Sequence, residues 1–153
     1  MLDITLITVG KIKDENCKKI AENYFKRLKP FARLEIIETK TSAFSAGTKE
    51  KAKKEEAENL KEILDKRNGA TVFLLAEEGV EFDSIAFAKS LEKINGPIIL
   101  IVAGALGWEK ELRSKYPKIS LSKLTMPHEL ARVVLLEQLY RAALILANKE
   151  YHY

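Results

Sequence analysis

The apolar run Pro97–Val102 constrains the fold more than any other stretch of the chain. It is short, rich in β-branched residues and bounded by Gly96 and Gly104, a pattern typical of a strand that is buried on both faces. Such strands occur mainly in parallel sheets, because the helices that connect parallel strands cover both sides of the sheet. The run therefore predicts the central strand of an α/β protein.

The segments on either side of this run alternate between strand and helix patterns. The predicted strands are residues 3–9, 33–38, 71–76 and 97–102, with a short one near 119–121. The predicted helices are residues 14–28, 49–67, 83–94, 108–115 and 127–148. This alternation predicts a mostly parallel sheet with helices on both faces. At 153 residues, the chain is expected to form a single domain, residues 1–153.

Composition excludes some classes of protein and leaves others open. The single cysteine, Cys17, rules out an internal disulfide and indicates no metal cluster, and we interpret it as a small apolar helix residue. The net charge of +4 is mildly favourable for an anionic partner. No signal-peptide pattern and no apolar run of about 18 residues is present, so we expect a cytoplasmic protein with no membrane partner.

The last predicted helix carries apolar residues nearly all round, among them Leu130, Val134, Leu135, Leu139 and Ile145. A helix of this kind must be covered on more than one side. If one sheet face covers only one stripe, a second copy of the chain is the simplest additional cover, which predicts a symmetric dimer. The alternative is a central core helix in a monomer.

Two loops beside predicted strand ends suggest a ligand site. The first contains Gly104 and Gly107, whose missing side chains permit positive φ and close backbone approach. The second runs through Ser120–Pro127 to the start of the last helix and offers hydroxyl and apolar side chains. Ligands bind at such places in open α/β sheets. Taken alone, the loops are more simply interpreted as ordinary turns and a helix N-cap, and no GxGxxG with a downstream acid supports a dinucleotide site.

Four side chains are candidates for proton transfer or anion binding. His128 follows a proline at the start of the last helix, and His152 lies near the end of the chain. Both also have simple structural interpretations, as first-turn packing and as a loose tail. Arg132 and Arg141 lie in an apolar helix, where a cation needs a partner. Glu137 is four residues before Arg141 and can pair with it, which leaves Arg132 as the freer cation for a phosphate or carboxylate.

Several motifs together resemble one known family. They are Ala103-Gly104 with Gly107, the stretch Ser120–His128, Arg132, the stretch Glu137–Ala142 and the final Tyr151-His152. In combination with the chain length and the opening Ile4–Lys11, they resemble the RlmH group of the SPOUT methyltransferases. The chain departs from that pattern at Ala103, where relatives carry glycine, and at Glu150 and Tyr153, where they carry proline and a basic residue.

The resemblance implies a fold and a cofactor. The fold is the SPOUT α/β-knot, in which the C-terminal segment passes through a loop to form a deep trefoil knot. The cofactor is S-adenosyl-L-methionine, and the resemblance implies no metal. The implied cofactor-binding residues are Leu75, Ala103, Gly104, Gly107, Leu121, Ser122, Lys123, Leu124, Thr125 and Met126. The implied catalytic candidates are His152, Tyr151, Arg132 and His128.

The resemblance also implies a substrate and a partner. The substrate is a pseudouridine of 23S ribosomal RNA, methylated at N3 on the assembled ribosome, and the enzyme is a homodimer with active sites at the subunit interface. A basic rim would contact the RNA: Lys11, Lys13, Arg113, Lys115, Lys118 and Lys123. Two alternatives stay open, a SPOUT methyltransferase acting on another RNA such as tRNA, and a non-catalytic dimeric ribosome-binding protein.

Overall fold

A computed structural model describes residues 1–151 and contains one parallel sheet of five strands in the order β2-β1-β4-β3-β5. The strands are β1 (Leu2–Val9), β2 (Ala32–Thr39), β3 (Thr71–Glu81), β4 (Ile98–Val102) and β5 (Lys118–Ser120). The predicted central strand is confirmed, because β4 lies in the middle of the sheet and all five of its residues are buried.

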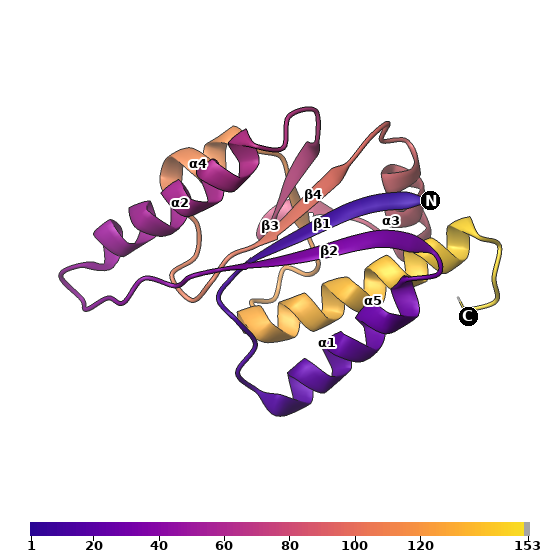
Figure 1. Cartoon of the computed structure of the whole chain (residues 1–153), viewed down its shortest axis with the longest axis horizontal. Coiled ribbons are helices and arrows are strands. Elements are labelled where there is room, and N and C mark those ends of the chain that lie inside the picture. Colours follow the sequence, from indigo (N-terminus) through magenta and orange to yellow (C-terminus); the bar gives the residue numbers. More distant parts are fainter. Residues whose placement is uncertain (152–153) are drawn as a thin grey trace.

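Helices cover both faces of this sheet (Figure 1). They are α1 (Glu15–Leu28), α2 (Lys49–Asp65), α3 (Ser84–Glu92), α4 (Lys110–Lys115) and α5 (His128–Leu146). The side chains of β4 alternate between the faces: Ile98 and Leu100 join the core under α1, α3 and α5, whereas Ile99 and Ile101 join the core under α2 and α4. The predicted α/β architecture is therefore confirmed. Among residues 1–151, no helix has the length and apolar content of a membrane span.

Carboxylates at the helix starts explain where three of these helices begin. Asp14 accepts a hydrogen bond from the Cys17 amide at 2.8 Å, and Asp83 accepts one from the Ala86 amide at 2.7 Å. Glu109 does the same for α4, and the amide bonds that it accepts hold the pKa of its carboxyl below the ordinary value. Such caps satisfy amides that have no partner within the helix.

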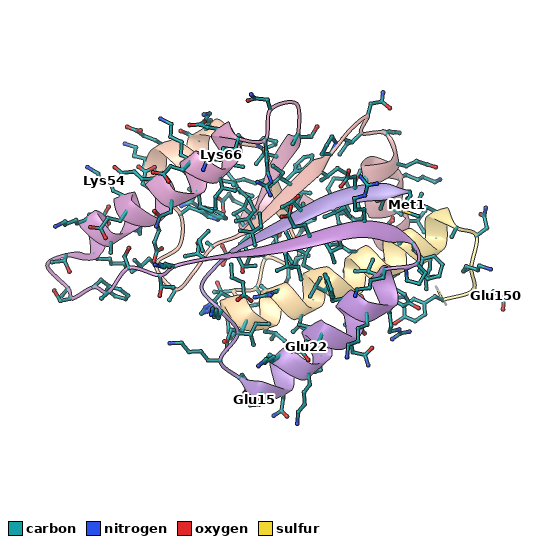
Figure 2. The ribbon with its side chains drawn as sticks, in the orientation of Figure 1. Met1, Glu15, Glu22, Lys54, Lys66 and Glu150 are labelled. Carbon is teal, nitrogen blue, oxygen red and sulfur yellow. The ribbon has the colours of Figure 1, made fainter. Side chains whose placement is uncertain are left out.

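Helix α2 is amphipathic, as predicted. Leu60 and Leu64 are buried against the sheet, while Lys54 and Lys66 project away from it into solvent (Figure 2). The dense charges of this helix therefore form a solvated face.

The sequence argument for a dimer from α5 fails, because α5 is covered within its own chain. It lies between α1 and α3 on one face of the sheet (Figure 1). Leu135, Leu136 and Leu139 are completely buried without a second copy. One helix layer holds three helices here, so the middle helix needs apolar residues on its flanks as well as beneath it. The homodimer stays a prediction that rests on the family resemblance.

Strand β3 is longer than predicted. The sequence predicted its end at Ala76, but it runs to Glu81, and its pairing with β5 shifts register between Leu75 and Val80. A Cβ atom on Gly79 would lie 2.6 Å from the main-chain carbonyl carbon of Ile119. The β5 backbone therefore passes so close to β3 that only glycine fits at position 79. The predicted trefoil knot stays a prediction.

Candidate functional site

A cavity of about 350 Å³ opens at the carboxyl end of β4, where its pairing with β3 stops, beside the start of α5. This volume falls within the range of small-molecule sites, and the position is the one where open parallel sheets bind ligands. The lining residues come from three segments of the chain: Leu75–Glu77; Val102–Ala105, Gly107 and Trp108; and Leu121, Ser122, Leu124–His128 and Ala131.

The structure brings together nearly all the residues predicted to bind a cofactor. Every one of them lines this cavity except Lys123. Lys123 is exposed, and its ammonium group lies 3.9 Å from the carboxylate of Glu81. It therefore points toward β3 and solvent rather than into the cavity.

The first loop is held by β1 and by a tryptophan. A Cβ atom on Gly104 would lie 3.0 Å from Cγ1 of Val9 and 3.2 Å from its carbonyl oxygen, so β1 leaves little room there. Gly107 has a φ of 73°, which favours glycine, and its amide donates to the carbonyl oxygen of Gly104. The indole Nε1–H of Trp108 donates to the carbonyl oxygen of Leu75 at 2.9 Å. This bond joins the loop to the middle of β3 across the cavity wall.

Ala103 fits this loop without backbone strain. Among residues 1–151, the non-glycine residue with positive φ is Asn148, so Ala103 has an ordinary backbone conformation. Alanine in place of glycine at this position therefore carries no energetic cost from a left-handed backbone conformation.

The second loop provides the apolar part of the site. Leu121 and Met126 are half-buried in the cavity wall, whereas Leu124 is 77% exposed beside it. The Leu124 amide donates to Oγ of Ser122 at 3.0 Å, which shapes the turn. His128, the first residue of α5, closes the wall. The site thus combines apolar side chains with main-chain donors and acceptors, a combination suited to a flat, weakly charged ligand.

Charge is scarce inside the cavity and paired around it. Among the described residues that line the cavity, Glu77 carries the one formal charge when His128 is neutral. Nearby, the guanidinium of Arg113 donates to Glu78 at 2.6 Å and lowers the pKa of that carboxyl. Such a lining is suited to a ligand that is recognised mainly by shape and hydrogen bonds.

Arg132 is not the free cation that the sequence suggested. Its guanidinium forms an ion pair with Glu38 of β2 at 2.7 Å and donates to Oγ1 of Thr8 in β1 at 3.4 Å. The residue is only 7% exposed and does not line the cavity. The prediction missed this pair because parallel pairing brings the ends of β1 and β2 under the first turn of α5. The predicted pair of Glu137 with Arg141 is confirmed at 2.6 Å.

Tyr151, the last described residue, does not line the cavity of its own chain. The ring of Tyr151 packs edge-on against Tyr140, 5.0 Å between centroids, and Arg141 lies over it at 4.9 Å. Tyr151 is therefore held well along α5 from the cavity. His152 lies outside the described residues.

Sequence reasoning missed two residues that organise the site. Trp108 was read only as the start of a helix, although a tryptophan directly after the loop glycine Gly107 is a usable signal. Glu38 carried no such signal, because its partner is far away in sequence and is brought close by strand register.

A parallel sheet with a small-molecule cavity at its carboxyl edge, built from two loops and a helix start, defines a ligand-binding α/β protein. The family model described as "Predicted SPOUT methyltransferase" matches residues 2–152. The chain belongs to the SPOUT methyltransferase family, as the sequence motifs predicted, and it is a methyltransferase.

Two relatives agree with this assignment, and one solved structure shares the fold. The chain is 37% identical over 160 residues to a protein of Ruminiclostridium cellulolyticum named "Ribosomal RNA large subunit methyltransferase H", with 99% of each chain covered. It is 38% identical over 165 residues to a protein of the same name from Oenococcus oeni, again with 99% of each covered. A probable methylase family protein from Haemophilus influenzae shares the fold, with a TM-score of 0.62, 14% identity, and coverage of 100% of this chain and 72% of that one.

Proposed function

We propose that this protein transfers the methyl group of S-adenosyl-L-methionine to N3 of a pseudouridine in 23S ribosomal RNA on the assembled ribosome. The observation that carries the proposal is the cavity, in which three separate segments meet with the residues that the family resemblance assigns to the cofactor. Relatives that match over nearly the full chain are named for methylation of large-subunit ribosomal RNA.

The residues of the cavity fit this cofactor. Leu75, Leu121 and Met126 offer apolar surface for an adenine ring and a methionine chain. The loop at Gly104 offers main-chain groups for the edge of the base, and Ser122 or Thr125 offers hydroxyls for the ribose or carboxylate. Glu77 offers a negative charge to a positively charged ligand.

Bound cofactor would supply an already activated methyl group, so the protein mainly has to align the acceptor nitrogen with it. An imide N–H acceptor must also lose a proton, which a nearby base can accept. His128 lines the cavity wall and is one candidate for this role. The tail with Tyr151 and His152 is the other.

The proposed enzyme works as a homodimer. Tyr140, on which Tyr151 is docked, follows His128 by twelve residues of α5, or roughly 18 Å of helix. One further residue extends the main chain by at most about 3.6 Å, so a tail docked there falls short of the cavity of its own chain. A second copy that packs on the face formed by α1 and α5 would bring its cavity to this tail.

The proposed RNA-contacting rim is weaker than the sequence alone indicated. Arg113 and Lys123 are already paired with Glu78 and Glu81. Lys11 and Lys13, beyond the end of β1, are both exposed near the start of α5 and are the better contacts to phosphate. Their contribution to binding should fall as salt concentration rises.

Mass spectrometry of ribosomal RNA nucleosides tests the proposed reaction. Ribosomes from a strain that lacks this protein should lack N3-methylpseudouridine in 23S RNA, and incubation with purified protein and S-adenosyl-L-methionine should restore it. Retention of the modified nucleoside in the deletion strain would argue against the assignment. Calorimetry with the cofactor alone tests the site separately, because a non-catalytic ribosome-binding protein would release no heat.

A further inference from the structure

The end of the described chain is held by a cluster of aromatic and basic side chains on the outer side of α1 and α5. Tyr24 and Arg27 come from α1, Tyr140 and Arg141 from α5, and together these four residues form what we call the tail-docking site. Tyr151 packs into it. The site is far along α5 from the cavity and has no part in forming its walls.

Arg27 is the centre of this site. Its guanidinium carbon lies 4.3 Å from the ring centroid of Tyr140, 5.6 Å from that of Tyr24 and 5.5 Å from that of Tyr151. It also donates a hydrogen bond to the hydroxyl of Tyr140 at 3.3 Å. One cation thus contacts three rings from three segments of the chain, within the distance at which cation–π attraction acts.

The second cation fixes the main chain of the tail. Arg141 Nη1 donates to the carbonyl oxygen of Tyr151 at 3.4 Å, and the same guanidinium is held by Glu137 through two hydrogen bonds of 2.6 and 3.1 Å. A guanidinium anchored on one side presents its remaining N–H groups in a fixed direction. The positions of the Tyr151 ring and of its carbonyl group are therefore both fixed.

The environment of Tyr24 supports the same picture. Burial and, next, hydrogen bonding with Tyr151 raise the pKa of its phenol. Tyr140 is only 8% exposed, and its ring lies 6.0 Å from that of Tyr24 and 6.3 Å from that of Phe31. The floor of the site is packed and rigid, so it can hold a tail in one place.

We propose that Arg27 is a positioning residue for the methyl transfer, because it clamps Tyr151, one of the catalytic candidates, between α1 and α5. This inference rests on the proposed function and deepens it. It assigns the tail a fixed anchor at the junction of two helices, in place of the loose end that a terminal segment has by default.

The test compares Arg27→Ala with Arg27→Lys and Lys26→Ala in methylation of ribosomes from a strain that lacks the protein. With loss of a three-ring contact, Arg27→Ala should lower kcat on the order of tenfold, while Arg27→Lys, which keeps the cation, should stay within about threefold of wild type. Lys26→Ala should behave as wild type, because Lys26 is exposed on the same helix and is absent from the aromatic contacts. The dissociation constant for S-adenosyl-L-methionine should not change in any variant.

A spectroscopic readout accompanies the kinetics. Nuclear Overhauser contacts between the Tyr140 and Tyr151 rings should be present in the wild type, lost in Arg27→Ala and retained in Lys26→Ala. A wild-type protein without methylation activity would defeat the proposed function itself. An active wild type with an equally active Arg27→Ala variant would overturn only this inference. Activity of Arg27→Ala that recovers fully at high protein concentration would also overturn it, because the residue would then act through assembly.

Discussion

The two ends of α5 differ in chemistry. At its start, Met126, His128 and Ala131 line an almost uncharged cavity, together with the middle of β3 and the loops that follow β4 and β5. Twelve residues later, Tyr140 and Arg141 form a dense array of rings and charges with α1. One helix thus carries a ligand-shaped cavity at one end and the tail-docking site at the other. The difference indicates that cofactor binding and the positioning of the tail can be disturbed separately.

The largest effect should come from Arg132, which lies near the start of α5 next to Ala131 but does not line the cavity. Arg132→Met leaves Glu38 without its partner beneath the first turn of α5. Arg132 is buried but Glu38 keeps contact with solvent, so losing this charge-assisted bond should lower the free energy of unfolding, measured by chemical denaturation, by about 2 kcal/mol. Cofactor binding in the cavity and the Tyr140–Tyr151 contact should both weaken. The double variant Glu38→Leu/Arg132→Met should regain most of the stability, and a single variant as stable as wild type would contradict the structural role.

Gly104→Val should damage the cavity end alone. The added side chain would meet Val9 of β1 and displace the first loop. Overpacking of about 1–3 kcal/mol corresponds to roughly a tenfold to hundredfold loss of affinity for S-adenosyl-L-methionine, measured by calorimetry. Gly47→Val is the matched control, since a Cβ there has no neighbour within 4 Å. Unchanged affinity in Gly104→Val would show that the loop does not bind the cofactor.

Trp108→Phe should also weaken cofactor binding, but less than Gly104→Val does. The phenyl ring keeps apolar contact but cannot donate to the carbonyl oxygen of Leu75. A lost hydrogen bond of about 1 kcal/mol predicts roughly a fivefold rise in the cofactor dissociation constant. The Tyr140–Tyr151 contact should persist in its NMR spectrum, and its loss would mean that the two ends are coupled.

The smallest effect should come from Glu56, which lies on α2 beneath the opposite face of the sheet. Its side chain is nearly buried and accepts from the Ser42 amide, and burial raises the pKa of the carboxyl. Because the ionised form is disfavoured in the folded state, Glu56→Gln should stabilise the protein at neutral pH by less than about 1 kcal/mol. This gain should shrink as pH falls through the raised pKa of the folded state and vanish below about 4.5, where the carboxyl becomes protonated in both states. A gain in stability that stays constant down to that pH would show that it comes from packing instead of charge. Cofactor binding and the Tyr140–Tyr151 contact should not change in this variant.

Periodicity and turn residues were sufficient to predict the layers of the fold. The buried run that became β4, the alternation of elements and the carboxylate caps are local signals, because each depends on residues close in sequence. The cavity could be predicted for a related reason: glycines after strand ends mark loops, and parallel strands bring their carboxyl ends to one edge.

The failures were long-range. The ion pair of Arg132 with Glu38 depends on which strands are neighbours and in which register, and no local pattern contains that information. The coverage of α5 by both α1 and α3 depends on the number of helices on one face. The apolar circumference of that helix was read correctly, but its cover comes from the same chain.

Gly79 shows how a residue without a side chain can govern a distant site. The main chain of Ile119 occupies the space that a Cβ would need, and β5 leads directly into the second loop of the cavity. In a saturation mutagenesis experiment, position 79 should therefore be as intolerant as a position in the cavity wall. The positions at which mutation impairs function should therefore include more residues than those that touch a ligand.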